Sequence, residues 1–367
     1  MSQPSPTRET KCPGCGGMLH YEPGTTTLHC EFCGASVAIA APGVDAAVRE
    51  FDLDAYIAGA SQNPDTRAVA AIACKGCGAT VTMPAGMATD FCPFCNSSLK
   101  NTAAQSEAAL KPQYLLPFTL DDKKANASFG SWLKTLWFAP GDLKKYASAN
   151  KLTGMYLPYW TFDAQARTAY TGQRGDDHET TETHSVTVNG KSETRTRKVK
   201  KTRWRSVAGS VGNVFDDVLV TATRSIPPAK LDQLEPWDLP KLVPFSEAFV
   251  QGFRSERYAV GLKEGVGIAK GKMEPVIRTA INRDIGGDHQ RIDSMESAWR
   301  SWKFKHVLPP VWVSAYRYRD KVFQFVVNAR TGEVQGDRPW SMVKIWPALP
   351  GGAAIAAGIM YLFQHLH

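Results

Sequence analysis

The stretch CPGCGGMLHYEPGTTTLHCEFC, residues 12–33, recurs in altered form as CKGCGATVTMPAGMATDFCPFC, residues 74–95. Each stretch reads CxxC, fourteen residues and CxxC, so each cysteine of the first recurs 62 positions later. A CxxC turn places two thiolates on one knuckle, and a second knuckle completes a tetrahedral zinc site with bonds of about 2.3 Å. The pattern therefore predicts two zinc ribbons. The predicted ligands are Cys12, Cys15, Cys30 and Cys33 for one ion and Cys74, Cys77, Cys92 and Cys95 for the other.

The residues that follow the four knuckles support this prediction. Glycine or asparagine tolerates the left-handed backbone of a knuckle turn, and these positions hold Gly16, Gly34, Gly78 and Asn96. Disulfides are the alternative, but eight cysteines in 367 residues are sparse for a disulfide scaffold, and we expect no secretory signal. Because each quartet is complete, both zinc ions are expected to be structural rather than catalytic.

The composition predicts a folded chain of about two domains. Apolar residues make up 43% of the sequence and include ten tryptophans, enough for a sizeable core. The formal net charge of +8 favours an anionic partner, either nucleic acid or a phospholipid surface. Thiolates that bind zinc need a reducing compartment, so we expect the cysteine-bearing part in the cytoplasm.

Composition shifts along the chain divide it into segments. We expect disorder in 1–10, ribbon 1 in 11–40, a linker with one short helix in 41–69, ribbon 2 in 70–100, a second linker in 101–111 and an α+β domain in 112–340. The expected fold class is thus α+β, with two small four-cysteine zinc ribbons, an antiparallel-sheet-rich domain and one C-terminal transmembrane helix.

A long charged hairpin is predicted at 165–210. Asn189 and Gly190 are the preferred pair for a two-residue type I′ turn. With that turn, opposite residues have numbers that sum to 379, which places three acids of one strand against three bases of the other. The pairs are Glu182 with Arg197, Glu179 with Lys200, and Asp176 with Arg203.

The returning strand is basic enough to suggest a second interpretation. Residues 195–205 hold seven basic residues in eleven, with Trp204 among them, which is also typical of a nucleic-acid patch. Because the acidic residues of the facing strand neutralise much of that positive charge, we favour a solvated hairpin over a nucleic-acid patch.

Helix and strand patterns organise the rest of the domain. Asp121 or Asp122 is expected to cap a helix that contains Trp132. A second helix is expected from an apolar stripe, although Pro275 should kink or divide it. The stripe consists of Leu262, Val266, Ala269, Met273, Val276 and Ala280. Strands are expected at 299–306, 311–318 and 321–328.

Residues 345–363 form an uncharged stretch of nineteen residues. As a helix they would span about 28 Å, close to the ~30 Å hydrocarbon core of a bilayer. Arg338 and Lys344 precede the stretch, so the positive-inside rule keeps the N-terminal bulk in the cytoplasm. We predict a single-pass tail in the cell inner membrane, with a buried or interfacial helix as the alternative.

No catalytic motif is present in the sequence. There is no GxxxxGK[ST], because Gly271 and Lys272 are followed by Met273, and there is no HExxH or GxSxG. Four acid–base candidates are scattered, and we interpret them as strand ends and hairpin partners: Asp163, Asp176, Asp177 and His178. We therefore expect no enzyme.

Several longer motifs resemble a bacterial family. They are YLPYWTFDA (156–164), FDDVLV (215–220), VLPPVWVSAYRYR (307–319) and VNARTGEVQGDRPWS (327–341). The family is that of TFIIB-type double zinc-ribbon membrane proteins, often labelled "primosomal protein N′ (replication factor Y), superfamily II helicase". The missing nucleotide-binding loop does not support the helicase label. The resemblance implies a scaffold that works with phage-shock-type or SPFH-type membrane proteins in envelope stress.

The sequence thus predicts a membrane-tethered cytoplasmic zinc-ribbon adaptor that binds protein partners without catalysis. The alternative is a zinc-ribbon nucleic-acid-binding protein linked to replication or transcription, without helicase activity. The ribbons and the net charge permit both.

Overall fold

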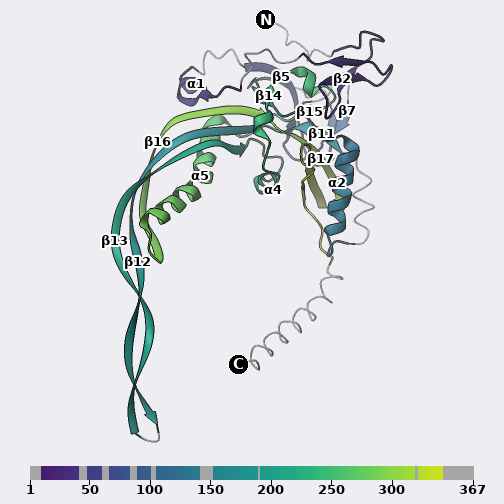
Figure 1. The fold of residues 1–367 in the computed structure, drawn as a ribbon. Helices are drawn as coiled ribbons and strands as arrows, with labels where there is room; N and C mark the ends of the chain where they lie inside the picture. Colours follow the sequence, from purple (N-terminus) through teal and green to yellow (C-terminus); the bar gives the residue numbers. More distant parts are fainter. Residues whose placement is uncertain are drawn as a thin grey trace.

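The computed structural model describes residues 10–40, 48–59, 66–82, 89–100, 105–140, 152–188, 191–318 and 321–341. Its largest sheet has six strands in the order β13-β12-β16-β10-β14, with β4 paired to β16, and continues into a long twisted arm (Figure 1). The strands are β4 Phe51–Asp52, β10 Tyr114–Leu115, β12 Tyr159–Val188, β13 Lys191–Thr221, β14 Val243–Pro244 and β16 His289–Leu308.

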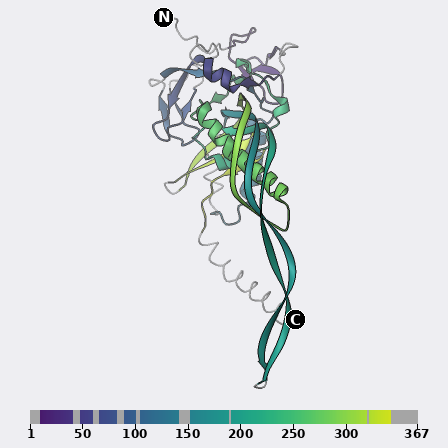
Figure 2. The ribbon, with the colours of Figure 1, turned by 90° about the vertical axis from the view of Figure 1, so that its left-hand side faces the viewer.

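The arm is the predicted charged hairpin, and it is longer than the predicted 165–210. β12 and β13 pair from Tyr159↔Thr221 to Val188↔Lys191, and the predicted register is confirmed, with Glu182 opposite Arg197. Residues 189 and 190, predicted as a type I′ turn, lie outside the described residues. β16 accompanies β12 only as far as Gly175, so the last part of the arm has two strands (Figures 1 and 2).

Helix α5, Leu262–Ile285, packs along the sheet at the base of the arm (Figure 1). It runs through Pro275 as one helix and is neither divided nor ended there. The buried stripe also differs from the predicted one. Beyond Met273 the buried positions are Ile277, Ile281 and Ile285, whereas the predicted Val276 is exposed and Ala280 is only partly buried. A stripe that advances by four residues drifts around the helix and follows the twist of the sheet beneath it.

A second sheet of five strands, β15-β11-β17-β18-β19, completes the body. Its strands are β11 Thr153–Tyr156, β15 Arg254–Ser255, β17 Pro310–Tyr318, β18 Lys321–Asn328 and β19 Val334–Gly336. Helix α2, Asp122–Thr135, covers this sheet, where Phe129 stacks on Phe325 with ring centroids 3.6 Å apart. Asp121 is the cap, since its Oδ1 accepts a hydrogen bond from the Lys124 N–H at 2.8 Å.

Short elements connect these sheets. They are α1 Leu53–Gly59, α4 Pro228–Asp232, and the 3₁₀ turns η3 Leu239–Lys241 and η4 Glu247–Val250. The ribbons use β1 Leu19–Tyr21, β2 Thr27–Cys30, β3 Ser36–Ala38, β5 Thr66–Ala73, β6 Thr80–Val81, β7 Thr89–Phe91, β8 Ser98–Lys100 and β9 Gln105–Leu110. Part of the expected linker at 101–111 therefore forms a strand, β9, antiparallel to β5.

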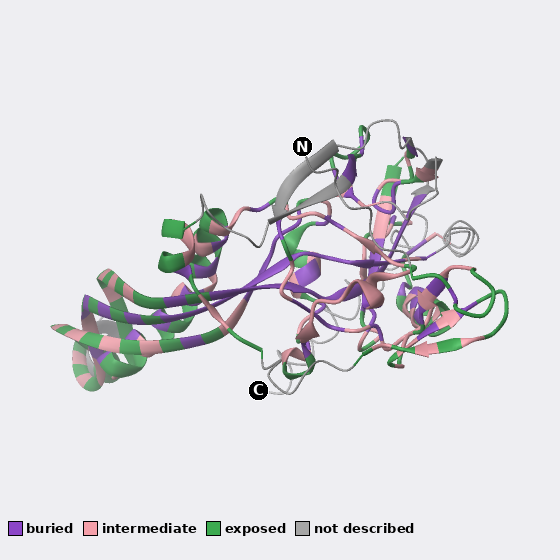
Figure 3. Cartoon of the chain, turned by 90° about the horizontal axis from the view of Figure 1, so that it is seen from above, coloured by how far each residue is buried: buried purple, intermediate pink, exposed green. Residues whose placement is uncertain are grey.

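Both ribbons share hydrophobic cores with the body. Leu19, Tyr21 and Leu28 of ribbon 1 belong to one core with Phe118. Ribbon 2 belongs to a second core, through residues such as Phe94. Seen from above, buried residues follow the strands through the body and alternate with exposed ones along the arm (Figure 3). The ribbons are thus packed onto the body.

The predicted membrane helix, 345–363, lies outside the described residues, as does the expected disorder of residues 1–9. Within the described ranges, no helix has both the length and the apolar character needed to cross a membrane.

Candidate metal centres

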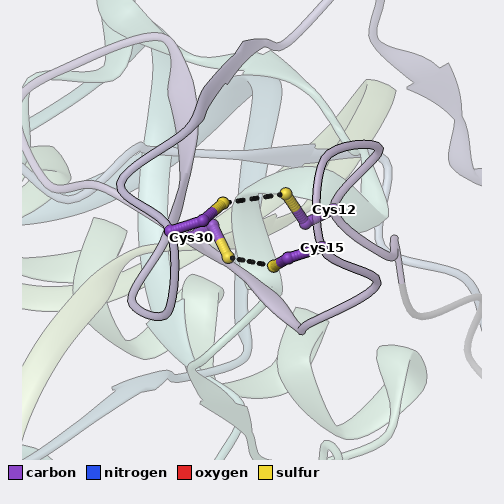
Figure 4. Close-up of side chains that lie close together, drawn as sticks. Cys12, Cys15 and Cys30 are labelled. Carbon is purple, nitrogen blue, oxygen red and sulfur yellow. Dashed lines mark hydrogen bonds between the residues drawn. The ribbon is translucent and has the colours of Figure 1, made fainter.

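In ribbon 1 the sulfur atoms lie at the spacing of a tetrahedral metal site. Cys12 Sγ is 3.5 Å from Cys33 Sγ. Cys15 Sγ is 3.5 Å from Cys30 Sγ (Figure 4). A tetrahedron with metal–sulfur bonds of 2.3 Å has edges of about 3.8 Å. The four thiols thus fit one zinc ion after a shift of a few tenths of an ångström.

Ribbon 2 repeats this geometry. Cys74 Sγ is 3.5 Å from Cys95 Sγ, and Cys77 Sγ is 3.7 Å from Cys92 Sγ. These separations are far longer than a disulfide bond of about 2.05 Å, and all eight thiols are free. In each quartet the four ligand atoms lie within 4.8 Å of one another. The two predicted quartets are confirmed as structural zinc sites.

The same backbone pattern builds all four knuckles. The N–H of the first cysteine donates to the carbonyl five residues later, and the N–H four residues later donates back to that cysteine, at 2.7–2.9 Å. The predicted left-handed positions are confirmed at Gly16, Gly34, Gly78 and Asn96, with φ from 58° to 78°. Such a turn costs an ordinary L-residue roughly 1–2 kcal/mol, which explains the choice of glycine and asparagine.

Backbone N–H groups also prepare the thiols to bind metal. The N–H groups of Gly14 and Cys15 hold the pKa of Cys12 below its ordinary value, and the Cys33 N–H lowers the pKa of Cys30 to about 6. The thiolate is the form that binds zinc, so these hydrogen bonds favour ligation by Cys12 and Cys30, whereas contacts with the neighbouring thiols raise the pKa of Cys15 to about 12 and also raise the pKa of Cys33. Four thiolates fill a tetrahedral zinc, which leaves no position for a substrate or a reactive water.

Ribbon 1 docks on the body through β1. The Tyr21 N–H donates to the Gln251 carbonyl at 3.0 Å, and the Tyr21 hydroxyl donates to the Phe118 carbonyl at 3.2 Å. The Tyr21 ring meets Phe249 edge-on, with centroids 5.2 Å apart. The Gly24 N–H adds a bond of 2.8 Å to the same Phe118 carbonyl. This face of ribbon 1 is therefore fixed.

Ribbon 2 docks through β6 and β7. The Thr82 N–H donates to the Ser255 carbonyl at 2.9 Å and continues the sheet edge. Arg254 forms a largely buried ion pair with Asp90, and its Nη1 donates to the Phe91 carbonyl at 2.9 Å. A buried ion pair with a further hydrogen bond fixes the orientation of this ribbon.

The two ribbons differ at one equivalent aromatic residue. Phe32 and Phe94, 62 positions apart, each precede the last cysteine of their quartet. Phe94 is 0% exposed in the core that ribbon 2 shares with the body, and its carbonyl accepts a hydrogen bond from Gln324 Nε2. Phe32 is 79% exposed. This contrast was not predicted, although a comparison of all residues 62 positions apart would have flagged the pair.

A second difference explains where the Phe32 ring lies. Gly17 occupies the position that Ala79 holds in ribbon 2. A Cβ on residue 17 would lie only 2.6 Å from Cδ2 of Phe32, so glycine is needed for the ring to lie there. The ring therefore has a defined place over the knuckle.

The four acid–base candidates do not converge. Asp176, Asp177 and His178 lie on the arm, thirteen or more residues along β12 from Asp163. Lys200 pairs with Asp177 at 2.8 Å and, with Thr202 and His289, lowers the pKa of Asp177 to about 2. Asp163 lies at the base of the arm, in a different cluster.

Comparisons with known proteins agree with the metal geometry. Residues 70–104 match the FORGETTER1 second zinc ribbon domain. The uncharacterized protein YdjG of Bacillus subtilis (strain 168) is 25% identical to this chain over 259 residues, which cover 70% of this chain and 72% of YdjG. No solved structure matches the chain. The geometry and the domain match together show a zinc-binding protein with two structural four-cysteine sites.

Proposed function

We propose that this protein is a noncatalytic adaptor that binds a protein partner through its first zinc ribbon. The contrast between Phe32 and Phe94 carries the proposal. In ribbon 2 this phenylalanine is buried where the ribbon docks on the body. Ribbon 1 docks through Tyr21 instead, which leaves its equivalent aromatic side chain exposed for another protein.

The setting of Phe32 suits a binding anchor. Rigid aromatic side chains often carry much of the energy of a protein interface. Phe32 lies between the zinc ligands Cys30 and Cys33 and rests over Gly17, so its backbone is held by the metal. A backbone that is already ordered loses little conformational entropy on binding. Zinc thus supports binding by holding the knuckle, without taking part in chemistry.

The proposal includes a membrane tether. Residues 345–363 anchor the adaptor in the cell inner membrane, with the N-terminal bulk in the cytoplasm. The uncharged stretch, the preceding Arg338 and Lys344, and the need of zinc thiolates for a reducing compartment support it. The family resemblance implies phage-shock-type or SPFH-type membrane proteins as partners in envelope stress.

Nucleic-acid binding is the second candidate, because Trp204 is half-exposed on the basic strand β13. Ion pairs within the arm weigh against it. Glu182 pairs with Lys201 at 2.8 Å, and Glu179 pairs with Lys198 at 3.3 Å. These pairs leave less unpaired positive charge to bind phosphates.

Site-specific photo-crosslinking tests the adaptor proposal. A photoreactive phenylalanine analogue at position 32 of the full chain should crosslink one or a few proteins in cells. The matched control is the same analogue at Phe91, which is 61% exposed on ribbon 2. Phe32→Ser should abolish retrieval of the crosslinked partner from solubilised membranes, while zinc content stays at two per chain.

Two outcomes would overturn the proposal. One is equal crosslinking at positions 32 and 91, and the other is unchanged retrieval of partners by Phe32→Ser. If instead the purified protein bound DNA with an affinity that fell linearly in a log–log plot against salt, the nucleic-acid candidate would replace the adaptor.

A further inference from the structure

A β-bulge at the base of the arm gathers acidic residues from distant segments. The β12–β13 register shifts between Phe162 and Ala164, so Asp163 stands at the irregularity. Opposite it, Asp217 has φ of 51°, and its N–H donates to Asp163 Oδ1 at 2.6 Å. Bulges redirect side chains from their usual faces. Here the bulge brings carboxylates of β12 and β13 together.

A third segment adds Glu50, which lies between the two ribbons and directly precedes β4. Glu50, Asp163 and Asp216 each offer a carboxylate oxygen, and the three oxygens lie within 4.8 Å of one another. Glu50 and Asp163 are more than a hundred residues apart in the sequence, and Asp163 and Asp216 are more than fifty residues apart. The fold alone assembles them.

Asp163 supplies an independent sign of a ligand. Its residue is only 9% exposed, and its Oδ2 is buried without a hydrogen-bond partner in the described part of the chain. The other oxygen, Oδ1, already accepts from Asp217. A buried carboxylate oxygen without a donor is costly unless a cation or a proton meets it.

The charge balance indicates the kind of ligand. Four carboxylates meet here, those of Glu50, Asp163, Asp216 and Asp217. Two ammonium groups face them: Lys303 Nζ is 2.8 Å from Glu50 Oε2, and Lys305 Nζ lies 2.6 Å from Asp217 Oδ1 and 3.4 Å from Glu50 Oε1. With all six groups ionised, these four negative and two positive charges leave a surplus of two negative charges, which one divalent cation would balance.

The donor atoms indicate a hard ion. Sites made of oxygen ligands alone suit Ca²⁺, Mg²⁺ and Mn²⁺. Zinc instead suits the two thiolate quartets. Ca²⁺–oxygen bonds of 2.3–2.6 Å allow two ligands on opposite sides of the ion to lie about 4.6–5.2 Å apart. The spread of the three oxygens therefore fits an ion of this size.

We infer that Glu50, Asp163 and Asp216 bind one hard divalent cation of the size of Ca²⁺ or Mn²⁺ at the base of the arm. The ion joins the segment between the ribbons to both strands of the hairpin. Asp216 is exposed, which gives the ion a route from solvent. The Lys303 side chain is half-exposed, so an ion at Glu50 would displace it toward solvent, while buried Lys305 keeps its closer partner, Asp217.

Mn²⁺ binding, followed by the loss of the free-ion electron paramagnetic resonance signal, tests the inference on zinc-loaded full-length protein. We expect one Mn²⁺ per chain, displaced by Ca²⁺, with affinity at least tenfold weaker in Glu50→Gln and in Asp216→Asn. The matched control is Asp176→Asn on the same strand, thirteen residues and about 43 Å from Asp163. It should bind Mn²⁺ like the wild type.

A thermal shift gives a second readout. Ca²⁺ should raise the melting temperature of the wild type and of Asp176→Asn but not of Glu50→Gln, because a ligand stabilises only the state that binds it. Absence of Mn²⁺ binding at millimolar concentration would overturn the site and assign the orphaned oxygen to a proton. Equal binding by wild type and both ligand variants would also overturn it.

Discussion

Glu256 is a buried carboxylate at the junction between ribbon 2 and the body. Its residue is 4% exposed, the Ser225 hydroxyl donates to Oε1, and Oε2 is buried without a hydrogen-bond partner in the described ranges. Burial raises the pKa of Glu256 to about 7, against an ordinary value of 4.5. The junction is therefore sensitive to pH near neutrality.

Stability should depend on pH through this residue. Because the folded pKa lies above the unfolded one, the proton on Glu256 stabilises the fold at low pH, and this contribution is lost as pH rises through about 7. Glu256→Gln cannot ionise, so its stability relative to the wild type should rise by on the order of 2–3 kcal/mol between pH 5 and 8. Urea unfolding of both proteins measures the difference, in which the common effect of zinc ligation cancels. If the free energies of unfolding of the two proteins changed in parallel between pH 5 and 8, the raised pKa of Glu256 would be contradicted.

Residues whose role is local were predictable. Knuckle cysteines and the left-handed Gly16 and Asn96 follow from spacing within a few residues. The exposure of Phe32 and the burial of Glu256 depend instead on which faces the ribbons turn toward the body. A single sequence does not determine those faces, because each ribbon is small and carries apolar residues on more than one side.

Each ribbon is an element whose stability depends on its metal. Structural zinc in small ribbons supplies roughly 10–16 kcal/mol of apparent binding free energy at neutral pH. Ribbon 1 places Leu19, Tyr21 and Leu28 in a core that it shares with Phe118. Metal loss should therefore disturb the body as well as the ribbon.

Cys33→Ser tests this coupling by removing one exposed ligand of ribbon 1. Zinc content should fall from two ions to one, and hydrogen exchange should quicken across residues 12–38 and at the Phe118 contact. The β17–β18 ladder should keep its protection. Cys95→Ser, the equivalent change in ribbon 2, should instead quicken exchange near Ser255. Unchanged exchange in residues 12–38 of Cys33→Ser would show that ribbon 1 folds without its metal.

Among the larger elements, strands and register were predicted better than the helix face. The register of the arm follows from one turn and one set of opposite charges, and the strand at 321–328 has its predicted bounds. The α5 stripe was displaced after Met273, since Val276 and Ile277 are both apolar and only packing against the twisted sheet selects Ile277. Periodicity alone left that choice open.

At the scale of the molecule, sites built from several segments were beyond prediction. Glu50, Asp163 and Asp216 had no shared spacing in the sequence, and a bulge brings two of them together. Asp163 was interpreted with the other acid–base candidates as a strand-end or hairpin residue, whereas it lies inside β12 at the bulge. Its cluster became visible only when the pairing of β4, β12, β13 and β16 was known.

The proposed tether is also tested on the whole molecule. Deleting residues 345–367 should release the protein from the membrane to the soluble fraction, because the deletion removes the uncharged stretch. Fractionation of cells that produce the full and shortened chains measures this, with two zinc ions per chain as the control for folding. If the shortened chain stayed at the membrane, the proposed tether would be wrong.

The two-stranded end of the arm has a mechanical consequence. From Gly175 to Val188 the strands have no third partner among the described residues, and thirteen residues extend about 43 Å. Such a ribbon acts as a lever whose pivot is the bulge. The far end, Val188, lies 25 residues or about 83 Å of strand from the bulge at Asp163, so a rotation of about 10° at the pivot displaces it by about 14 Å. An ion bound beside Asp163 would thus set the angle between the arm and the body of the protein.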